Sequence, residues 1–357
     1  MAAFEYNVAT ITGRLLKATF VCLVIVFLCV VPAIARRSPS EPVELTLYPA
    51  KAPESAEKHR LLPKTYGQTD ADAVPLYEKA VQSLPKNLDM NQVRQWLGTP
   101  LDKLPRQQVK STLEKLEPAL QLIEQAIKCK PRSWPQFVQG TLPPNLTEYR
   151  ELGFVLAAKA RLQIAERNYE QAIGTIQIGF AMAKHVGESP TVTQGMTGVA
   201  IAASMCRQLE QLIQAQDAPN IYLPLQELPR PLVDLNIPIT VEMSNAKSSR
   251  QYNVIVRRAL IRHLESSYTR IRLLMNRLDR HVAALQCVEA LRLYAGAHDG
   301  KFPDKLSDVT EVVVPEDPVS KKPFVYRRTG SKAVLEAPAP NGATAKDAIK
   351  YRLILKE

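Results

Sequence analysis

Cysteine is scarce and scattered in this sequence. Only five cysteines occur among 357 residues, and two of them, Cys22 and Cys29, lie in an apolar run near the N-terminus. The other three, Cys129, Cys206 and Cys287, are far apart, and no CxxC pair is present. These spacings exclude a disulfide framework and a cysteine zinc site. Each of the three lies in a helical apolar pattern, which predicts small buried hydrophobic residues.

Sequence motifs of catalytic sites are also absent. The chain has no GxSxG elbow, no HExxH and no P-loop. A hydrolase would need His185, Glu188 and Asp234 to meet in one pocket with a nucleophile. A histidine near the C-terminal end of a helix more often complements the helix dipole. We therefore predict no enzyme, and no catalytic, cofactor-binding or metal-binding residue.

Glycine is modest in number at 14 residues, whereas proline is abundant at 27. Such a chain has many positions at which a helix or strand must end, and few flexible stretches. Hydrophobic residues make up 46% and charged residues 23%, the balance of a folded protein. The length predicts two or three structural units. The net charge of +11 shows only that acidic partners are not repelled.

The N-terminal residues have the composition of a membrane anchor. Arg14 and Lys17 precede residues 18–35, which carry no charge and are mostly apolar. A spanning helix needs about 17–25 apolar residues. A small-x-small sequence at 33–35 resembles a signal peptidase site, but two arginines follow it. We expect residues 1–35 to be an uncleaved anchor of a single-pass protein in the inner (cytoplasmic) membrane, with the bulk of the chain extracytoplasmic. The alternative is export of the protein after cleavage of a signal peptide.

Two further units follow the predicted anchor. Residues 36–72 contain five prolines without sustained periodicity, which predicts a stiff, extended linker. Residues 73–243 have helical periodicity and predict a helical body. One of its helices ends before Pro131 and places these apolar residues on one face: Val109, Leu113, Leu116, Leu120, Ile123 and Ile127. Another is predicted to begin at Asn145, with Glu148 as its capping-box partner.

Two helical patterns, joined by a turn at 166–168, occupy residues 149–185. Small or aromatic residues recur in them: Ala160, Tyr169, Ala172 and Gly179. This segment resembles one tetratricopeptide hairpin, in which such residues let two antiparallel helices approach closely. No second copy occurs at the 34-residue spacing, so no superhelical groove is implied. A third helix is predicted over 192–214, followed by a connector with five prolines between 219 and 238.

Residues 244–300 predict one long basic helix or two helices in series. Apolar residues alternate three- and four-residue steps there: Ile261, Leu264, Tyr268, Ile271, Met275, Leu278, Val282 and Leu285. This pattern is an a/d seam, which we expect the helical body to cover, with dimerisation as the alternative.

The same segment is strongly basic. Nine Lys or Arg residues lie between Lys247 and Arg280, against Glu265 and Asp279. One interpretation is a contact of the 247–280 helix with an anionic surface, such as lipid or cell-wall polymer. The interpretation that we favour is a solvated helix face whose arginines pair with acidic residues of the body. No nucleic acid is expected as a partner.

Residues 301–357 predict a small antiparallel sheet. Strands are expected at 324–328, 332–336 and 349–355, with a turn at 329–331. Apolar residues share one face of the last strand: Ile349, Tyr351, Leu353 and Leu355.

The motifs that lead into this sheet resemble a known domain. A helix ending in LRLY is followed by GKFP at 300–303, and then by DP and KPFVY between 317 and 326. These motifs resemble the C-terminal domain of the major pseudopilin of type II secretion systems, which implies a small α+β fold. In that family the anchor begins the same helix and a calcium loop is rich in Asp. Here the anchor lies far upstream, and residues 339–346 contain no acidic residue, so neither calcium binding nor fibre assembly is expected.

Two further stretches are distinctive: AKHVGESPT at 183–191, and APNIY through LPRPLVDL at 218–235. Together with the anchor and the tail, they are similar to a family of membrane-anchored helical proteins common in planctomycete-type bacteria, which has no established activity. We predict a mainly α fold with a tetratricopeptide-like hairpin and a small pseudopilin-like antiparallel sheet. The predicted function is a non-enzymatic cell-envelope scaffold or adaptor with protein partners. The alternatives are an accessory component of a type II secretion or type IV pilus-like machinery, and a hydrolase of unknown substrate.

Overall fold

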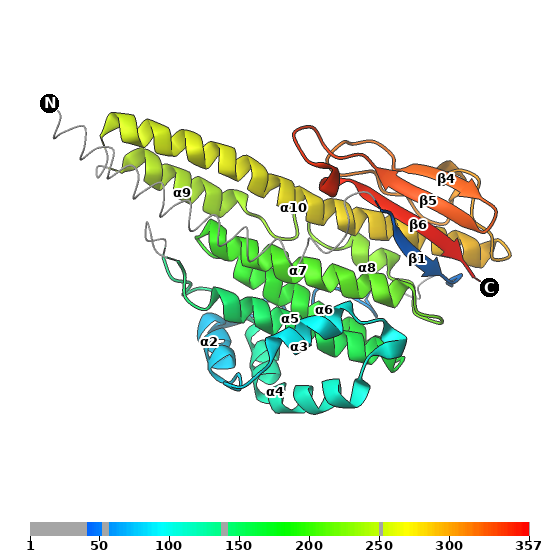
Figure 1. Ribbon diagram of the computed structural model, residues 1–357, viewed down its shortest axis with the longest axis horizontal. Helices are drawn as coiled ribbons and strands as arrows, with labels where there is room; N and C mark the ends of the chain where they lie inside the picture. The colour runs from blue at the N-terminus through cyan, green and yellow to red at the C-terminus, as the bar shows by residue number, and fades with distance from the viewer. Residues whose placement is uncertain (1–40, 52–56, 137–141, 250–252, 357) are drawn as a thin grey trace.

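The computed structural model describes residues 41–51, 57–136, 142–249 and 253–356 (Figure 1). Over these residues the chain is mainly helical, with a small mixed four-stranded sheet formed largely near the C-terminus. The prediction of a mainly helical chain with a small C-terminal sheet is therefore confirmed. The predicted anchor, residues 1–35, lies outside the described residues.

None of the helices that the structure describes is both long and apolar enough to span a membrane. This finding overturns the predicted single-pass localisation in the inner membrane. That prediction depended entirely on residues 18–35, which are not among the described residues.

The first part of the helical body contains three helices: α2 (Val74–Gln82), α3 (Met90–Gly98) and α4 (Arg106–Ala126). Asp89 begins α3 as its N-cap, because its side chain accepts hydrogen bonds from the backbone of Asn91 and Gln92. All six apolar positions predicted for one face of α4 and its end are buried. Beside α4, the short strands β2 (Thr69–Asp72) and β3 (Cys129–Lys130) pair in parallel.

Three longer helices form the centre of the body: α5 (Leu146–Ala165), α6 (Tyr169–Gly187) and α7 (Val192–Ile213) (Figure 1). The capping box predicted for α5 is wrong. Asn145 has a φ of 59° and its side chain makes no cap hydrogen bond. A capping side chain needs an extended backbone to reach the first amides, and the left-handed backbone of Asn145 does not provide one.

Close backbone approach joins α6 to α7. A Cβ atom at Gly198 would lie 2.5 Å from the carbonyl oxygen of Ala183 and 2.9 Å from the amide nitrogen of Gly187. Only glycine fits there, because both neighbours are backbone atoms. Gly179, one of the small residues of the predicted hairpin, faces Met205 of α7 rather than α5. Gly179 therefore serves packing against the third helix.

Two helices follow the short helix α8 (Tyr222–Gln226), and the predicted basic segment 244–300 contains the end of the first and all of the second. They are α9 (Asn236–Ser248) and the 44-residue α10 (Val254–Ala297). Six seam residues of α10 are buried: Tyr268, Ile271, Met275, Leu278, Val282 and Leu285. Ile261 and Leu264 are half-buried. Helices α7, α8 and α9 pack on α10, so the expected cover within the chain is confirmed for most of the seam.

The sheet has the order β1-β6-β5-β4. Strands β4 (Val325–Thr329), β5 (Lys332–Ala337) and β6 (Ile349–Leu355) are antiparallel, close to the predicted bounds. A two-residue turn joins β4 to β5, and Gly330 has a φ of 61°, which glycine adopts without strain. The four apolar residues predicted to share one face of β6 are buried.

The fourth strand, β1 (Val43–Leu47), was not predicted. It pairs in parallel with β6, with Val43 opposite Tyr351 and Leu47 opposite Leu355. The sheet is therefore mixed and not antiparallel, and part of the predicted linker 36–72 belongs to the folded core. Leu45 and Leu47 point into that core, where both are almost fully buried.

Candidate functional site

Charged and polar side chains are buried along the C-terminal half of α10. Buried residues of this kind in α10 include Asp279, Arg280, Gln286, Glu289 and Arg292. Charged residues are almost never fully buried unless they are paired. Their partners therefore show which segments α10 holds together.

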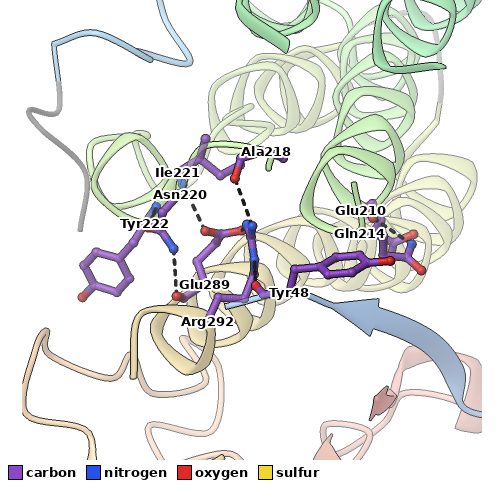
Figure 2. Close-up of polar contacts among 9 residues, drawn as sticks. All are labelled: Tyr48, Glu210, Gln214, Ala218, Asn220, Ile221, Tyr222, Glu289 and Arg292. Atoms are coloured by element: carbon purple, nitrogen blue, oxygen red, sulfur yellow. Dashed lines mark hydrogen bonds and ion pairs between the residues drawn. The ribbon is translucent and has the colours of Figure 1, made fainter. Parts of the chain in front are cut away.

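Glu289 and Arg292 form the most deeply buried ion pair of this group (Figure 2). Arg292 Nη1 donates to Glu289 Oε1 at 2.7 Å, and the two side chains are 1% and 0% exposed. Arg292 also donates through Nε to the carbonyl oxygen of Tyr48 and through Nη2 to that of Ala218, each at 3.0 Å. One guanidinium thus joins α10 to the chain after β1 and to the chain after α7.

Glu289 makes further contacts on the same side. Its Oε2 accepts a hydrogen bond from the amide of Ile221 at 3.1 Å, and its backbone carbonyl accepts one from the side-chain amide of Asn220 at 3.0 Å. Burial raises the pKa of Glu289 above its ordinary value, although the charge of Arg292 acts in the opposite direction. The hydrogen bonds from Arg292 and Ile221 therefore offset part of the cost of burying the Glu289 carboxylate.

The backbone after β1 lies directly on α10. The amide of Ala50 donates to the carbonyl oxygen of Arg292 at 3.0 Å. A Cβ atom at Gly296 would lie 2.1 Å from the carbonyl oxygen of Ala50, so this crossing requires glycine. The N-terminal strand is therefore fastened to α10 by its backbone as well as by Arg292.

Helix α7 contacts the sheet through two polar side chains, Glu210 and Gln214. Glu210 Oε1 accepts a hydrogen bond from Tyr351 Oη of β6 at 2.9 Å and lies 3.0 Å from His281 Nε2 of α10. Gln214 Oε1 accepts one from the backbone amide of Thr46 in β1 at 3.2 Å. Both strands at this side of the sheet are thus held by α7.

A second buried ion pair joins α10 to the loops of the tail. Arg280 Nε lies 3.0 and 3.1 Å from the two carboxylate oxygens of Asp317, and Nη2 donates to the carbonyl oxygen of Pro338 at 2.7 Å. Nη1 donates to the carbonyl oxygen of Asp347. Burial acts to raise the pKa of Asp317, but its hydrogen bonds, led by the one from Arg280, hold it below the ordinary value. Asp317 belongs to the DP motif of the predicted tail.

The residues considered for a hydrolase have different surroundings. His185 is fully buried, and its Nδ1 lies 2.9 Å from Tyr77 Oη. Burial lowers the pKa of His185 to about 3, so the imidazole is neutral at pH 7. Trp134 Nε1 donates to the backbone carbonyl of His185 at 3.0 Å. These contacts place His185 in an aromatic cluster that packs α2 against α6.

Glu188 and Asp234 have contacts of their own. Glu188 accepts hydrogen bonds from Tyr66 Oη at 3.1 Å and from Lys184 Nζ at 2.7 Å. The ring of Tyr66 also lies 4.6 Å from that of His185, so one tyrosine contacts both residues. Asp234 accepts from the backbone and side-chain amides of Asn236. In the described part of the chain, no hydrogen bond or ion pair joins Asp234 to His185 or Glu188.

The basic segment is divided in two. Near its C-terminal end Arg280 is buried, and Arg277 Nη1 lies 4.0 Å from Asp347 Oδ1. These two arginines pair with acidic residues, as the favoured interpretation predicted, but those residues belong to the tail and not to the body. Nearer the start of α10, Arg258, Arg262 and Arg270 are exposed.

No sequence motif indicated a role for Glu210, Glu289 or Arg292. The signal that could have found the last two is an ionisable pair three residues apart within the apolar run 282–295. In the described ranges, no group of three or more His, Cys, Asp or Glu residues is arranged to hold a metal ion. Comparison of the chain with family models, curated proteins and solved structures finds no match, so both family resemblances stay predictions.

Proposed function

We propose that this protein is a non-enzymatic scaffold or adaptor that presents partner-binding surfaces on a rigid frame. The observation that supports this proposal most is the set of buried ionic contacts of α10. Through them, one helix fastens β1, the end of α7 and the loops of the tail, which are hundreds of residues apart in sequence.

The contacts of these ionic groups favour a structural role. The N–H groups of Arg292 and Arg280 donate to four backbone carbonyls and two carboxylates. Burying such ions costs several kcal/mol each, and their mutual attraction offsets this only when the geometry is good. A frame that must hold several segments in one arrangement gains positional specificity from such contacts. A catalytic group would instead have to face a substrate.

The accessory role in a secretion or pilus-like machinery is the second candidate. Helix α10 leads into the antiparallel strands β4, β5 and β6, and the DP loop at Asp317 docks on that helix. This arrangement supports the proposal that the tail resembles a pseudopilin C-terminal domain. The parallel strand β1 is a departure from the expected sheet. The α5–α6 pair is proposed as the tetratricopeptide-like hairpin of the body.

Cross-linking in the source cells, followed by purification of the full chain, tests the proposal. A scaffold should be recovered with one or more proteins in fixed stoichiometry, and pseudopilins among them would favour the second candidate. Glu188→Gln should leave this set unchanged, because the Glu188 side chain hydrogen-bonds to Tyr66 and Lys184 of the same chain. Recovery of the chain alone, together with a hydrolytic activity that Glu188→Gln abolishes, would refute the proposal.

A further inference from the structure

Helices α9 and α10 form an antiparallel pair that projects beyond the helical body (Figure 1). Tyr268 Oη of α10 donates to Glu242 Oε2 of α9 at 2.6 Å, and Arg257 Nη1 donates to the carbonyl oxygen of Ser249 at 3.2 Å. The pair is thus fastened along its length. Several side chains in the first five turns of α10 are exposed.

One side of these turns carries three exposed arginines, which we call the basic face: Arg258, Arg262 and Arg270. Glu265 is the acidic residue among the exposed positions there. Arg272 is exposed too, but it is directed toward α9, where its Nε donates to Asn236 Oδ1 at 3.4 Å. Within the described residues, the other three arginines have no acidic partner. Their charges are therefore available to a ligand.

Two large apolar side chains lie at one end of the basic face. Val254 is 52% exposed and Ile255 is 80% exposed, at the first two positions of α10. Ile255 points to the same side of the helix as Arg258 and Arg262, because residues three, four and seven apart share a face. A ligand that follows the arginines would reach this apolar end.

We infer that the basic face binds an extended, Asp- and Glu-rich segment of a partner protein, with an apolar residue of that segment against Val254 and Ile255. The inference rests on the proposed scaffold function and names the chemistry of one partner. From Arg258 to Arg270 the helix rises about 18 Å, at about 1.5 Å per residue. An extended chain of about five or six residues has that length.

The composition of the face favours carboxylates carried on a protein chain. All three cations of the face are arginine, whose planar guanidinium matches a carboxylate in a bidentate pair. A helix that lies on a lipid surface turns its apolar stripe toward the acyl chains. The apolar stripe of α10 is turned inward, since Tyr268, Ile271 and Met275 are buried. Lying flat on a bilayer would therefore bury only the apolar end of the basic face.

The test is a peptide titration of the full chain. The probe is a fluorescein-labelled peptide of six glutamates that ends in leucine. Its binding is measured by fluorescence anisotropy at low and at physiological salt. Arg258→Glu/Arg262→Glu should weaken binding roughly tenfold or more, which corresponds to about 1.4 kcal/mol at the lower limit. Lys110→Glu/Lys115→Glu changes the net charge equally at exposed lysines of α4 and is the matched control, expected to stay within about twofold.

A second variant tests the apolar end. Ile255→Ser should weaken binding of the leucine peptide but not of the same peptide ending in alanine. All these positions are exposed, so each variant should keep the melting temperature of the wild type.

Three results would overturn the inference. Equal weakening by the two double variants would mean that only net charge matters. Binding of phosphatidylserine vesicles, or of a single-stranded oligonucleotide, that depends on Arg258 and Arg262 without peptide binding would identify another class of ligand. Failure of the peptide to bind, while Arg258→Glu/Arg262→Glu still co-purifies with the same proteins, would remove this inference and leave the scaffold function standing. Peptide binding without any co-purifying protein would remove the scaffold function and leave this inference standing.

Discussion

Replacing Arg292 by leucine should be among the most damaging single substitutions in this chain. The change leaves Glu289 buried without its cation, and it removes the donors to the carbonyl oxygens of Tyr48 and Ala218. Breaking a buried ion pair by removing one partner costs about 3–5 kcal/mol. Whole domains are stable by only about 5–15 kcal/mol, so this single change should remove a large part of the free energy of unfolding.

A double-mutant cycle with Glu289→Leu separates the ion pair from the rest of the effect. Removing both charges should destabilise the protein less than Arg292→Leu alone, since the buried carboxylate is then gone. Urea unfolding followed by circular dichroism measures all three variants. Arg327→Leu is the matched control, because Arg327 pairs with Glu336 at an exposed position of β4 and should cost no more than about 1 kcal/mol. A cost of Arg292→Leu similar to that of the control, without coupling to Glu289, would refute the reasoning.

Three further substitutions test other parts of the fold. Gly296→Ala should lower the melting temperature, because its Cβ would meet the backbone of Ala50. Gly174→Ala is the control and should be neutral or stabilising, because the added atom meets nothing within 4 Å. Calorimetry of both variants measures the difference in melting temperature. Leu278→Ala in the seam should cost about 2–5 kcal/mol in urea unfolding of the monomer, and a seam that served a dimer would instead show changed sedimentation with unchanged stability. Asp279→Asn tests the pH dependence. Burial raises the pKa of Asp279 to about 6 from an ordinary 3.8, so its contribution to stability is present below pH 4 and is lost as the pH rises through 6. Burial lowers the pKa of His185 to about 3 from 6.5, so its contribution is present above pH 6.5 and is lost as the pH falls toward 3. The two trends oppose each other between pH 4 and 6, and Asp279→Asn should therefore make the unfolding free energy rise more steeply with pH there; an unchanged slope would contradict the burial of Asp279.

Local periodicity predicted the helices well. The seam of α10 repeats every three or four residues, and neighbouring turns of one helix produce that pattern without any distant partner. The buried face of β6 was predicted for the same reason, since alternation is a property of the strand itself. Capping depended on more than residue type. Asn145 has a suitable side chain, but its left-handed backbone turns that side chain away from the first amides.

The strand β1 and the buried ion pairs could not be predicted in this way. Val43 pairs with Tyr351, about three hundred residues along the chain, and no local pattern records such a partner. The prolines on both sides of β1 indicated an extended linker. They lie outside the five residues of β1, so they do not interrupt the strand. Glu289 and Arg292 appear in the sequence as an ordinary charged pair on a helix. Their role depends on contacts with Tyr48, just after β1, and with Ile221, just before α8, which only the tertiary structure shows.

Amide hydrogen exchange of β1 is the most direct test of the claim that α10 and its ionic contacts hold the chain in one frame. Peptides from Val43–Leu47 and the amide of Ala50 should exchange as slowly as those of α7, because they open only when the whole frame unfolds. In Arg292→Leu the protection of Ala50 should fall before that of α7. If β1 in the wild type exchanged at the rate of an unstructured chain while α7 and α10 stayed protected, this segment would be a linker after all, and the frame would not include it.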